Sequence, residues 1–207
     1  MIKMMLFLVN GETIKKLTGY NMKFYTSDLH FDHANMLKFE PDSRPFRNVD
    51  EMNEALIQYW NDKVKPGDEV YILGDFCFDT KGNRANNFLR RLNGQKFLIK
   101  GNHDAFLRAK AFDKSLFVWI KDYAEVRDTV NGEDVSVCLF HYPIAVWNRK
   151  HHHAYHLFGH IHSNKSDGSH HPLDFDLGDH AFNVGADVRD LEPVTLEELI
   201  KSKRRGY

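Results

Sequence analysis

The sequence predicts a mixed α/β domain in which helices cover layered β-structure. Three observations lead to this prediction. Strand-like and helix-like segments alternate from residue 22 to about 104, strand-like segments dominate from about residue 117, and polar residues follow most of the predicted strands. Alternating strands and helices are typical of layered α/β folds. Because 207 residues suit one domain of ordinary size, we expect a single domain over residues 22–207.

Residues 1–21 are expected to be a hairpin or an N-terminal extension. The apolar start "MIKMMLFLV" precedes Asn10-Gly11, a common hairpin turn. This stretch is shorter than the ~18 apolar residues that a membrane span needs, and no small-residue cleavage site of a secretory signal follows it. If Met22 is the natural start, the first 21 residues are instead an extension.

The first half of the domain contains three predicted buried strands, at 22–28, 69–73 and 95–104, and two helices between them. In the helix over 48–62, Asn48 and Glu51 form a capping box. Apolar residues then recur at helical spacing and predict a buried stripe, which consists of Met52, Leu56, Tyr59 and Trp60. The second helix, over 84–94, ends at Gly94.

The second half is predicted to be rich in strands. The segment "DTVNGEDVSVCLFHYP" (128–143) predicts a hairpin that turns at Asn131-Gly132. Two further strands are expected in "YHLFGHIH" (155–162) and "HAFNVGAD" (180–187), and a last helix over 193–205 begins with the capping box Thr195–Glu198.

Charge and cysteine content exclude several classes of protein. With 28 basic and 29 acidic residues, the chain does not resemble a protein that coats extended nucleic acid. Cys77 and Cys138 lie in apolar surroundings, which favours buried thiols without a disulfide partner and a reducing, cytoplasmic setting. We expect no association with a membrane, because no segment has the length of a span.

Polar residues with metal-binding side chains follow five of the predicted strands. The ordered motifs are "DLH", "GD", "GNHD", "H" and "GHIH", which place Asp28, His30, Asp75, Asn102, His103, Asp104, His141, His160 and His162 at strand ends. Ligands of open α/β sheets bind beyond the carboxyl ends of the strands. Carboxylates, imidazoles and one amide carbonyl are typical ligands of divalent metals. The set therefore indicates a metal site at this edge.

Through these motifs, the sequence resembles the calcineurin-like metallophosphoesterases from residue 22 to about 194, in particular their compact bacterial and phage-type branch. The resemblance implies a β-sandwich flanked by α-helices, with two metals at the C-terminal edge of the strands. It also implies one metal on Asp28, His30 and His162, a second on Asn102, His141 and His160, and Asp75 as the bridge between them. A shared water or hydroxide would attack phosphorus, and His103 would face the leaving group.

Elementary chemistry supports this division of roles. A bridging position suits the two charged oxygens of Asp75, whereas Asn102 can ligate only through its carbonyl oxygen. His103 is then available to donate a proton to the leaving oxygen, with its ring oriented by Asp104 or Asp79. Substrate contacts are predicted for three residues near the first motif, namely His33, Asn35 and Arg44.

Other polar residues are expected to lie outside the metal site. Asn183 is expected to support the site from behind. The three adjacent histidines at 151–153 are expected in a solvated loop, and surface or supporting positions are expected for His156, His170, His171 and His180.

The predicted function is hydrolysis of a small or nucleotide-like phosphate ester, most simply a diester, by a dinuclear metal centre. The mixed nitrogen and oxygen ligands permit Mn, Fe, Zn, Ni or Co, with Mn favoured. Alternatives are a phosphomonoesterase on the same site, a nuclease, which would need a basic groove, and a metal-stabilised binding module without catalysis.

Overall fold

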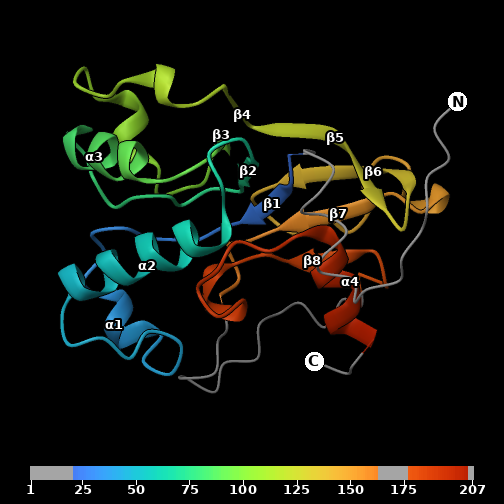
Figure 1. Cartoon of the computed structure of the whole chain (residues 1–207), viewed down its shortest axis with the longest axis horizontal. Helices are drawn as coiled ribbons and strands as arrows, with labels where there is room; N and C mark the ends of the chain where they lie inside the picture. Colours follow the sequence, from blue (N-terminus) through green and yellow to red (C-terminus); the bar gives the residue numbers. More distant parts are fainter. Residues whose placement is uncertain (1–20, 163–176, 205–207) are drawn as a thin grey trace, which may run out of the picture.

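Two four-stranded sheets form the centre of the part of the chain that the computed structural model describes, residues 21–162 and 177–204 (Figure 1). The first sheet is parallel, in the order β1 (Lys23–Thr26), β2 (Glu69–Ile72), β3 (Gln95–Ile99) and β4 (Trp119–Lys121). The second contains β5 (Tyr123–Val130), β6 (Glu133–Phe140), β7 (Tyr155–Phe158) and β8 (Ala181–Asn183), with only β5 antiparallel to its neighbour.

The helices are α1 (Met36–Phe39), α2 (Val49–Lys63), α3 (Asn83–Arg91) and α4 (Leu196–Arg204). Short 3₁₀ turns occupy Ala105–Arg108, Lys114–Leu116, Lys150–His152 and Ala186–Val188. The predicted capping box at Thr195 is confirmed, because Thr195 and Glu198 bond reciprocally. At Asn48 the predicted box is confirmed in part. Asn48 accepts from the Glu51 N–H at 2.9 Å, whereas the Glu51 carboxylate accepts from the Arg47 N–H at 3.1 Å. These caps satisfy N–H groups that a helix start leaves without a partner.

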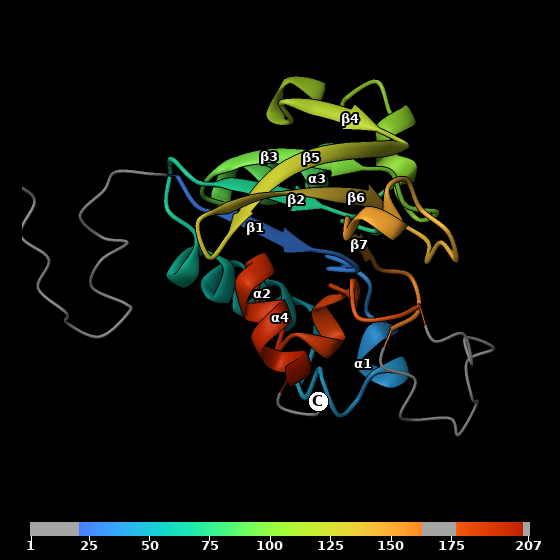
Figure 2. The same cartoon turned by 90° about the vertical axis from the view of Figure 1, so that its right-hand side faces the viewer.

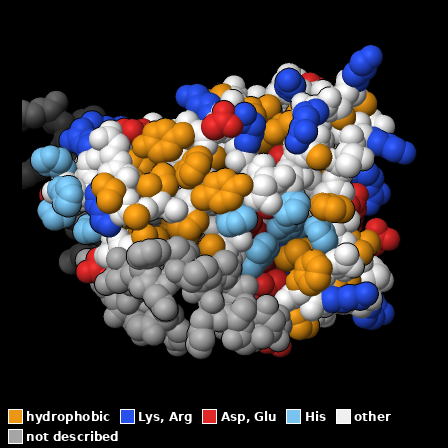
Figure 3. Space-filling model, turned by 180° about the vertical axis from the view of Figure 1, so that it is seen from behind, with side chains coloured by type: hydrophobic (Ala, Val, Ile, Leu, Met, Phe, Trp, Pro, Cys, Tyr) orange, Lys and Arg blue, Asp and Glu red, His pale blue; other side chains and the backbone are white. Residues whose placement is uncertain are grey.

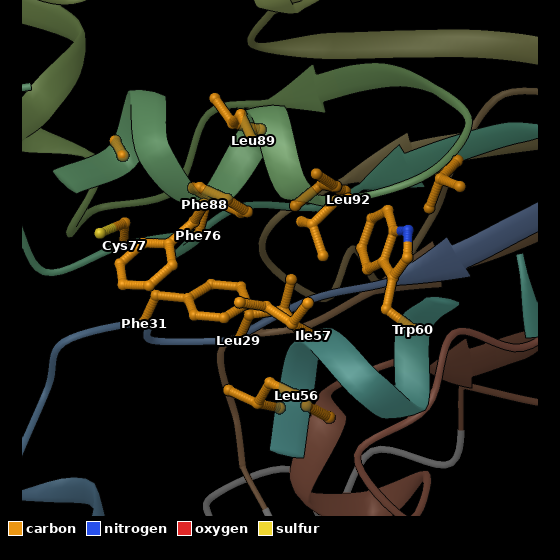
Figure 4. Close-up of a cluster of buried hydrophobic side chains, with 14 of the residues drawn as sticks. Leu29, Phe31, Leu56, Ile57, Trp60, Phe76, Cys77, Phe88, Leu89 and Leu92 are labelled. Carbon is orange, nitrogen blue, oxygen red and sulfur yellow. The ribbon is translucent and has the colours of Figure 1, made fainter. Parts of the chain in front are cut away.

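Alternation along the strands divides the core into two layers. Tyr25, Tyr71 and Leu73 point from the first sheet toward the second, where they pack with residues such as Leu139 and Leu157. Their neighbours along β1 and β2 point the other way, toward α2 and α3. This helix-facing layer contains Leu56, Trp60, Phe88 and Leu89 (Figure 4). In the view of Figure 2, α2 and α4 lie below β1.

The edges of the two sheets are joined on both sides. At one edge only Asp122 separates β4 from β5. At the other, a bridge connects Ser27 with Gly185, and Tyr25 pairs with Val194. The β5–β6 hairpin turns at Asn131 and Gly132, which both have positive φ values, as a two-residue hairpin turn requires. The predicted sandwich and hairpin are confirmed, whereas β4 has no clear sequence signal.

Some predictions concern residues beyond this description. The hairpin proposed for residues 1–21 and the positions of His170 and His171 lie outside the described residues. Cys77 and Cys138 are buried free thiols, as their apolar neighbours indicate. Among the described helices, none has the length and apolar character of a membrane span.

Candidate metal centre

The predicted ligands converge from the ends of β1, β2, β3, β6 and β7. Two groups made up of predicted ligands have ligand atoms that all lie within 4.8 Å of one another, and a third such group joins His162 to Glu40 and Asp187. We call Asp28, His30 and His162 the first group, and Asp75, His141 and His160 the second group. Oδ2 of Asp75 lies 3.7 Å from Nε2 of His30 and 3.6 Å from Nε2 of His141. Asp75 therefore lies between the two groups, where a bridging ligand would have to be.

Asn102 adds an amide oxygen to the second group. Its Oδ1 lies 2.9 Å from Nε2 of His141, whose Nδ1 lies 2.7 Å from the carbonyl oxygen of Leu73. Because that carbonyl can only accept, Nδ1 of His141 carries the proton and Nε2 presents a lone pair. The lone pair faces oxygens of Asn102 and Asp75. Three electron-pair donors thus converge, an arrangement that suits a cation.

The first group leaves buried polar atoms without hydrogen bonds. Within the described residues, Oδ1 of Asp28 and both ring nitrogens of His30 have no hydrogen-bond partner. An unpartnered buried polar atom costs on the order of 1–3 kcal/mol. Burial raises the pKa of Asp28 and lowers that of His30, so the imidazole is neutral, which is its ligating form. The donor set and its unpartnered atoms fit divalent metals.

The chain is sharply turned at the ligands. Asp28, His30, Asp75, His160 and His162 all have positive φ values. This left-handed conformation is uncommon for residues with a Cβ and is found most often where function requires it. Backbone hydrogen bonds hold the turns against one another, for example from Asp28 N–H to the Gly74 carbonyl at 3.0 Å. The strain thus turns side chains of successive strands toward one point.

Glycine precedes the ligand in "GNHD" and in "GHIH" because the turns approach too closely for a side chain. A Cβ on Gly101 would overlap the carboxylate of Asp75, and one on Gly159 would overlap Ser27 and the carboxylate of Asp28. These glycines allow ligand-bearing turns to pack directly together.

Asp187 and Arg44 support the first group from behind. Oδ2 of Asp187 lies 2.6 Å from Nδ1 of His162, and its Oδ1 accepts from Nε of Arg44 at 2.5 Å. Although burial alone would lower the pKa of His162, Asp187 and Asp28 raise it overall. A carboxylate behind a ligating histidine fixes the ring and its tautomer, which leaves Nε2 of His162 for a metal.

The prediction that Arg44 contacts substrate is wrong. Arg44 is 1% exposed, and its guanidinium also donates to the backbone carbonyls of Leu29 and Asp28. A buried guanidinium needs such acceptors, so Arg44 holds the turn that carries Asp28. Sequence reasoning missed Asp187, although "VGAD" directly after β8 repeats the pattern of an acid at a strand end.

Asp104 also differs from its predicted role. Its carboxylate accepts from the N–H groups of Gly101, Asp75 and Phe76, at 2.8, 3.1 and 2.8 Å. Burial raises the pKa of Asp104 to about 6. Asp79 likewise accepts from backbone N–H groups at the start of α3. Both carboxylates thus fix the backbone around the site and do not orient the His103 ring.

His103 lies at the open side of the centre and outside both groups. Its side chain is exposed, and its backbone N–H donates to Oδ1 of Asp75 at 2.7 Å. Its ring centroid is 5.6 Å from that of His30. His33 lies 5.4 Å from His30, and Asn35 is exposed at the start of α1. Histidine side chains accordingly gather on one face of the molecule (Figure 3).

The remaining polar residues are placed as follows. His151, His152 and His153 are exposed. His156 is fully buried and bonded to backbone groups. The prediction that it lies at the surface or supports the metal site is therefore wrong. Asn183 accepts from the Gly185 N–H at 2.8 Å and stabilises the turn before Asp187.

A groove opens beside the centre at Asn102. Its volume is about 840 Å³, and basic and aromatic side chains form much of its wall, notably those of Lys100, Arg108, Lys114, Phe140 and Tyr142. Lys100 pairs with Asp122 at 2.6 Å. Neither Arg108 nor Lys114 forms an ion pair with any described residue. The groove therefore offers positive charge next to the second group.

Comparison with known proteins agrees with this site. The family described as calcineurin-like phosphoesterase matches residues 24–164, a range that includes both ligand groups and Asn102. The uncharacterized protein MJ1445 of Methanocaldococcus jannaschii is 32% identical over 187 residues, which cover 88% of this chain and 92% of that protein.

Two further matches are similar in kind. The gene 66 protein of Mycobacterium phage D29 is 34% identical over 85 residues, or 39% of each chain. The crystal structure of AQ665 from Aquifex aeolicus, titled a protein of unknown function, has a TM-score of 0.65 at 25% identity and covers 88% of this chain and 100% of its own. These matches confirm the family resemblance that the motifs indicate.

Proposed function

The chain belongs to the calcineurin-like phosphoesterases, metal-dependent hydrolases with a dinuclear centre, and we propose that it hydrolyses a small or nucleotide-like phosphodiester. The observation that carries the proposal is the pair of ligand groups with Asp75 between them. When bound, two divalent cations lower the pKa of a water and stabilise charge on the attacking and leaving oxygens.

The roles of the protein residues follow from their positions. The first and second groups bind the cations, and Asp75 contributes to both. His103 protonates the leaving oxygen, a role supported by its exposed ring beside His30 and its absence from both groups. Such proton donation contributes ~10²–10⁴-fold to the rate. The hydrogen bond from the His103 N–H to Asp75 keeps the donor close to the centre.

The groove at Asn102 supports a diester over a monoester. A diester has a second ester arm that needs room beside the metals, and the groove provides that room together with the positive charges of Arg108 and Lys114. Manganese is the proposed metal, because nitrogen and oxygen ligands without thiolate suit it. The buried free thiols of Cys77 and Cys138 support a cytoplasmic setting.

A hydrolysis panel tests the proposal. Bis-nitrophenyl phosphate, nitrophenyl phosphate and a cyclic nucleotide are compared with Mn²⁺, and with a chelator as the metal-free control. We expect metal-dependent hydrolysis with a higher kcat/KM for the diesters. A preference for nitrophenyl phosphate would favour the phosphomonoesterase. No turnover of any substrate by fully loaded protein would favour the binding module.

A further inference from the structure

Two large hydrophobic side chains remain exposed beside the metal centre. Phe78 is 51% exposed and Phe39 is 57% exposed. Both rings lie near His33, with the Phe78 centroid 4.1 Å and the Phe39 centroid 6.1 Å from that of the His33 ring. We call His33, Phe39 and Phe78 the aromatic platform. Exposed aromatic surface that gathers in one place commonly marks a binding site.

The aromatic platform is continuous with the reacting groups. The ring of Phe78 lies 6.1 Å from that of His103, and the ring of His33 lies 5.4 Å from that of His30. A group attached to the leaving oxygen at His103 would therefore lie next to the Phe78 ring. In Figure 3, hydrophobic side chains lie at the surface next to the gathered histidines.

The backbone of the aromatic platform is firmly held. The N–H of Phe78 donates to the Phe31 carbonyl at 2.8 Å, close to the bridge between Phe31 and Cys77. The N–H of Phe39 donates to the Asn35 carbonyl at 3.0 Å, and that of His33 to the His30 carbonyl at 3.1 Å. A preorganised surface loses little entropy when a ligand binds to it.

We propose that the aromatic platform binds the base of a nucleotide ester, which stacks on Phe78 while its phosphate lies at the metal centre. This inference rests on the proposed function and specifies its substrate class. A flat base fits because each face of its ring system can stack on an exposed phenylalanine, whatever the base. An aliphatic leaving group cannot stack on a ring and would gain only the burial of apolar area. The aromatic platform would therefore favour a base over an aliphatic group.

Binding of two matched probes tests the inference without relying on turnover. Adenosine 5′-monophosphate and ribose 5-phosphate differ only in the base, and their affinities for Mn²⁺-loaded protein are measured by calorimetry, with phosphate release monitored. We expect adenosine 5′-monophosphate to bind about tenfold more tightly, in line with the usual contribution of one stacked base. Phe78→Ala and Phe78→Leu should remove this preference, whereas Phe78→Trp should retain it.

Val118→Ala serves as the matched control. Val118 is 57% exposed and lies just before β4, at the edge of the sheet away from the metal ligands. This variant should keep the base preference and the metal content. Equal affinities of the two probes, binding of neither probe, or a preference that survives Phe78→Ala would overturn the inference.

Two further measurements distinguish base binding from self-association and from hydrolysis. If sedimentation shows a dimer that Phe78→Ala dissociates without changing the probe ratio, the aromatic platform binds a second copy of the chain and the inference fails. Hydrolysis of bis-nitrophenyl phosphate by the same protein is a separate test of the proposed function. Hydrolysis without a preference for the base would contradict this inference and leave the proposed function standing. A preference for the base without hydrolysis would contradict only the proposed function.

Discussion

Two buried histidines, His30 at the metal centre and His156 on the outer face of the second sheet, differ in what their ring nitrogens meet. His156 is fully buried, its Nε2 accepts from the Ile144 N–H at 3.0 Å, and its Nδ1 lies 3.2 Å from the Cys138 carbonyl. His30 is 2% exposed, and neither of its nitrogens has a hydrogen-bond partner within the described residues.

The difference separates a structural imidazole from a ligating one. Burial lowers the pKa of both rings, so both are neutral at pH 7. The fold itself supplies a donor and an acceptor to His156, and that ring needs nothing further. At His30 the fold supplies only neighbouring ligand groups, and neither ring nitrogen forms a hydrogen bond with a described residue. A buried polar site that the protein leaves incomplete is one that a cation can complete.

The largest expected effect comes from Asp75→Asn, because this residue serves both ligand groups. One bridging charge is lost, and two cations are then poorly neutralised. We expect metal content to fall at both groups and kcat/KM to fall on the order of 10³-fold, since charge stabilisation by such cations is worth several kcal/mol. Elemental analysis and hydrolysis of bis-nitrophenyl phosphate measure these effects. His33→Ala is the comparison variant, which should keep both metals and lose less activity than Asp75→Asn. Wild-type metal content would show that another residue bridges.

The contrast between the two histidines is tested by changing them in turn. His156→Gln should lower stability and leave the metal content unchanged. His30→Gln should instead lower the metal content. Burial lowers the pKa of His156 to about 4, below the ~6.5 of an unfolded chain. Its contribution to stability is therefore complete above pH 6.5 and is lost as the pH falls toward 4. The loss amounts to about 3 kcal/mol.

Urea unfolding of chelator-treated protein at pH 7, 5 and 4 measures this contribution. The wild type should lose its advantage over His156→Gln across this range. A constant difference between wild type and His156→Gln would mean that His156 is not held neutral.

A smaller and more selective effect is expected from His103→Gln. Nitrophenolate departs without much help, whereas a sugar alkoxide needs a proton in the transition state. The variant should keep both metals and lose roughly 10²-fold more kcat/KM on a nucleotide diester than on the activated aryl diester. Equal losses on the two substrates would indicate that His103 stabilises charge on the phosphoryl group instead. Loss of a metal would make His103 a ligand.

Much of the fold was predictable because its local signals agree with its tertiary structure. The N-cap at Asn48, the hairpin turn at Asn131 and the strand-end motifs are short patterns whose physical meaning does not depend on distant residues. β4 was missed because three residues at an edge carry too little pattern, and their pairing with β3 comes from tertiary contact.

The supporting residues of the site were harder to predict than its ligands. Metal-binding residue types are recognisable at strand ends, but nothing in the sequence distinguishes Arg44 from a surface arginine. Only the fold brings it to Asp187, 143 residues away, and to the carbonyl of Asp28. Asp104 was misjudged for the same reason, since its three backbone donors come from two different strand ends.

The smallest expected effect distinguishes the two ligand groups from each other. His162 of the first group is backed by the carboxylate of Asp187, whereas His141 of the second is backed by the Leu73 carbonyl. Asp187→Asn removes the charge that orients His162 and places an amide between that ring and Arg44. Partners of this kind contribute about 10–100-fold to metal affinity. We therefore expect a loss near the lower end of that range, about tenfold, in the first group alone.

Dialysis against graded chelator, followed by elemental analysis, measures this loss. Asp187→Asn should release one metal at a lower chelator concentration than wild type and hold the other as wild type does. Asp128→Asn is the matched control, because Asp128 accepts a hydrogen bond from the Tyr25 hydroxyl at 2.8 Å and belongs to neither ligand group. Simultaneous release of both metals from Asp187→Asn would show that the groups are coupled through Asp75 more strongly than their separate supports suggest.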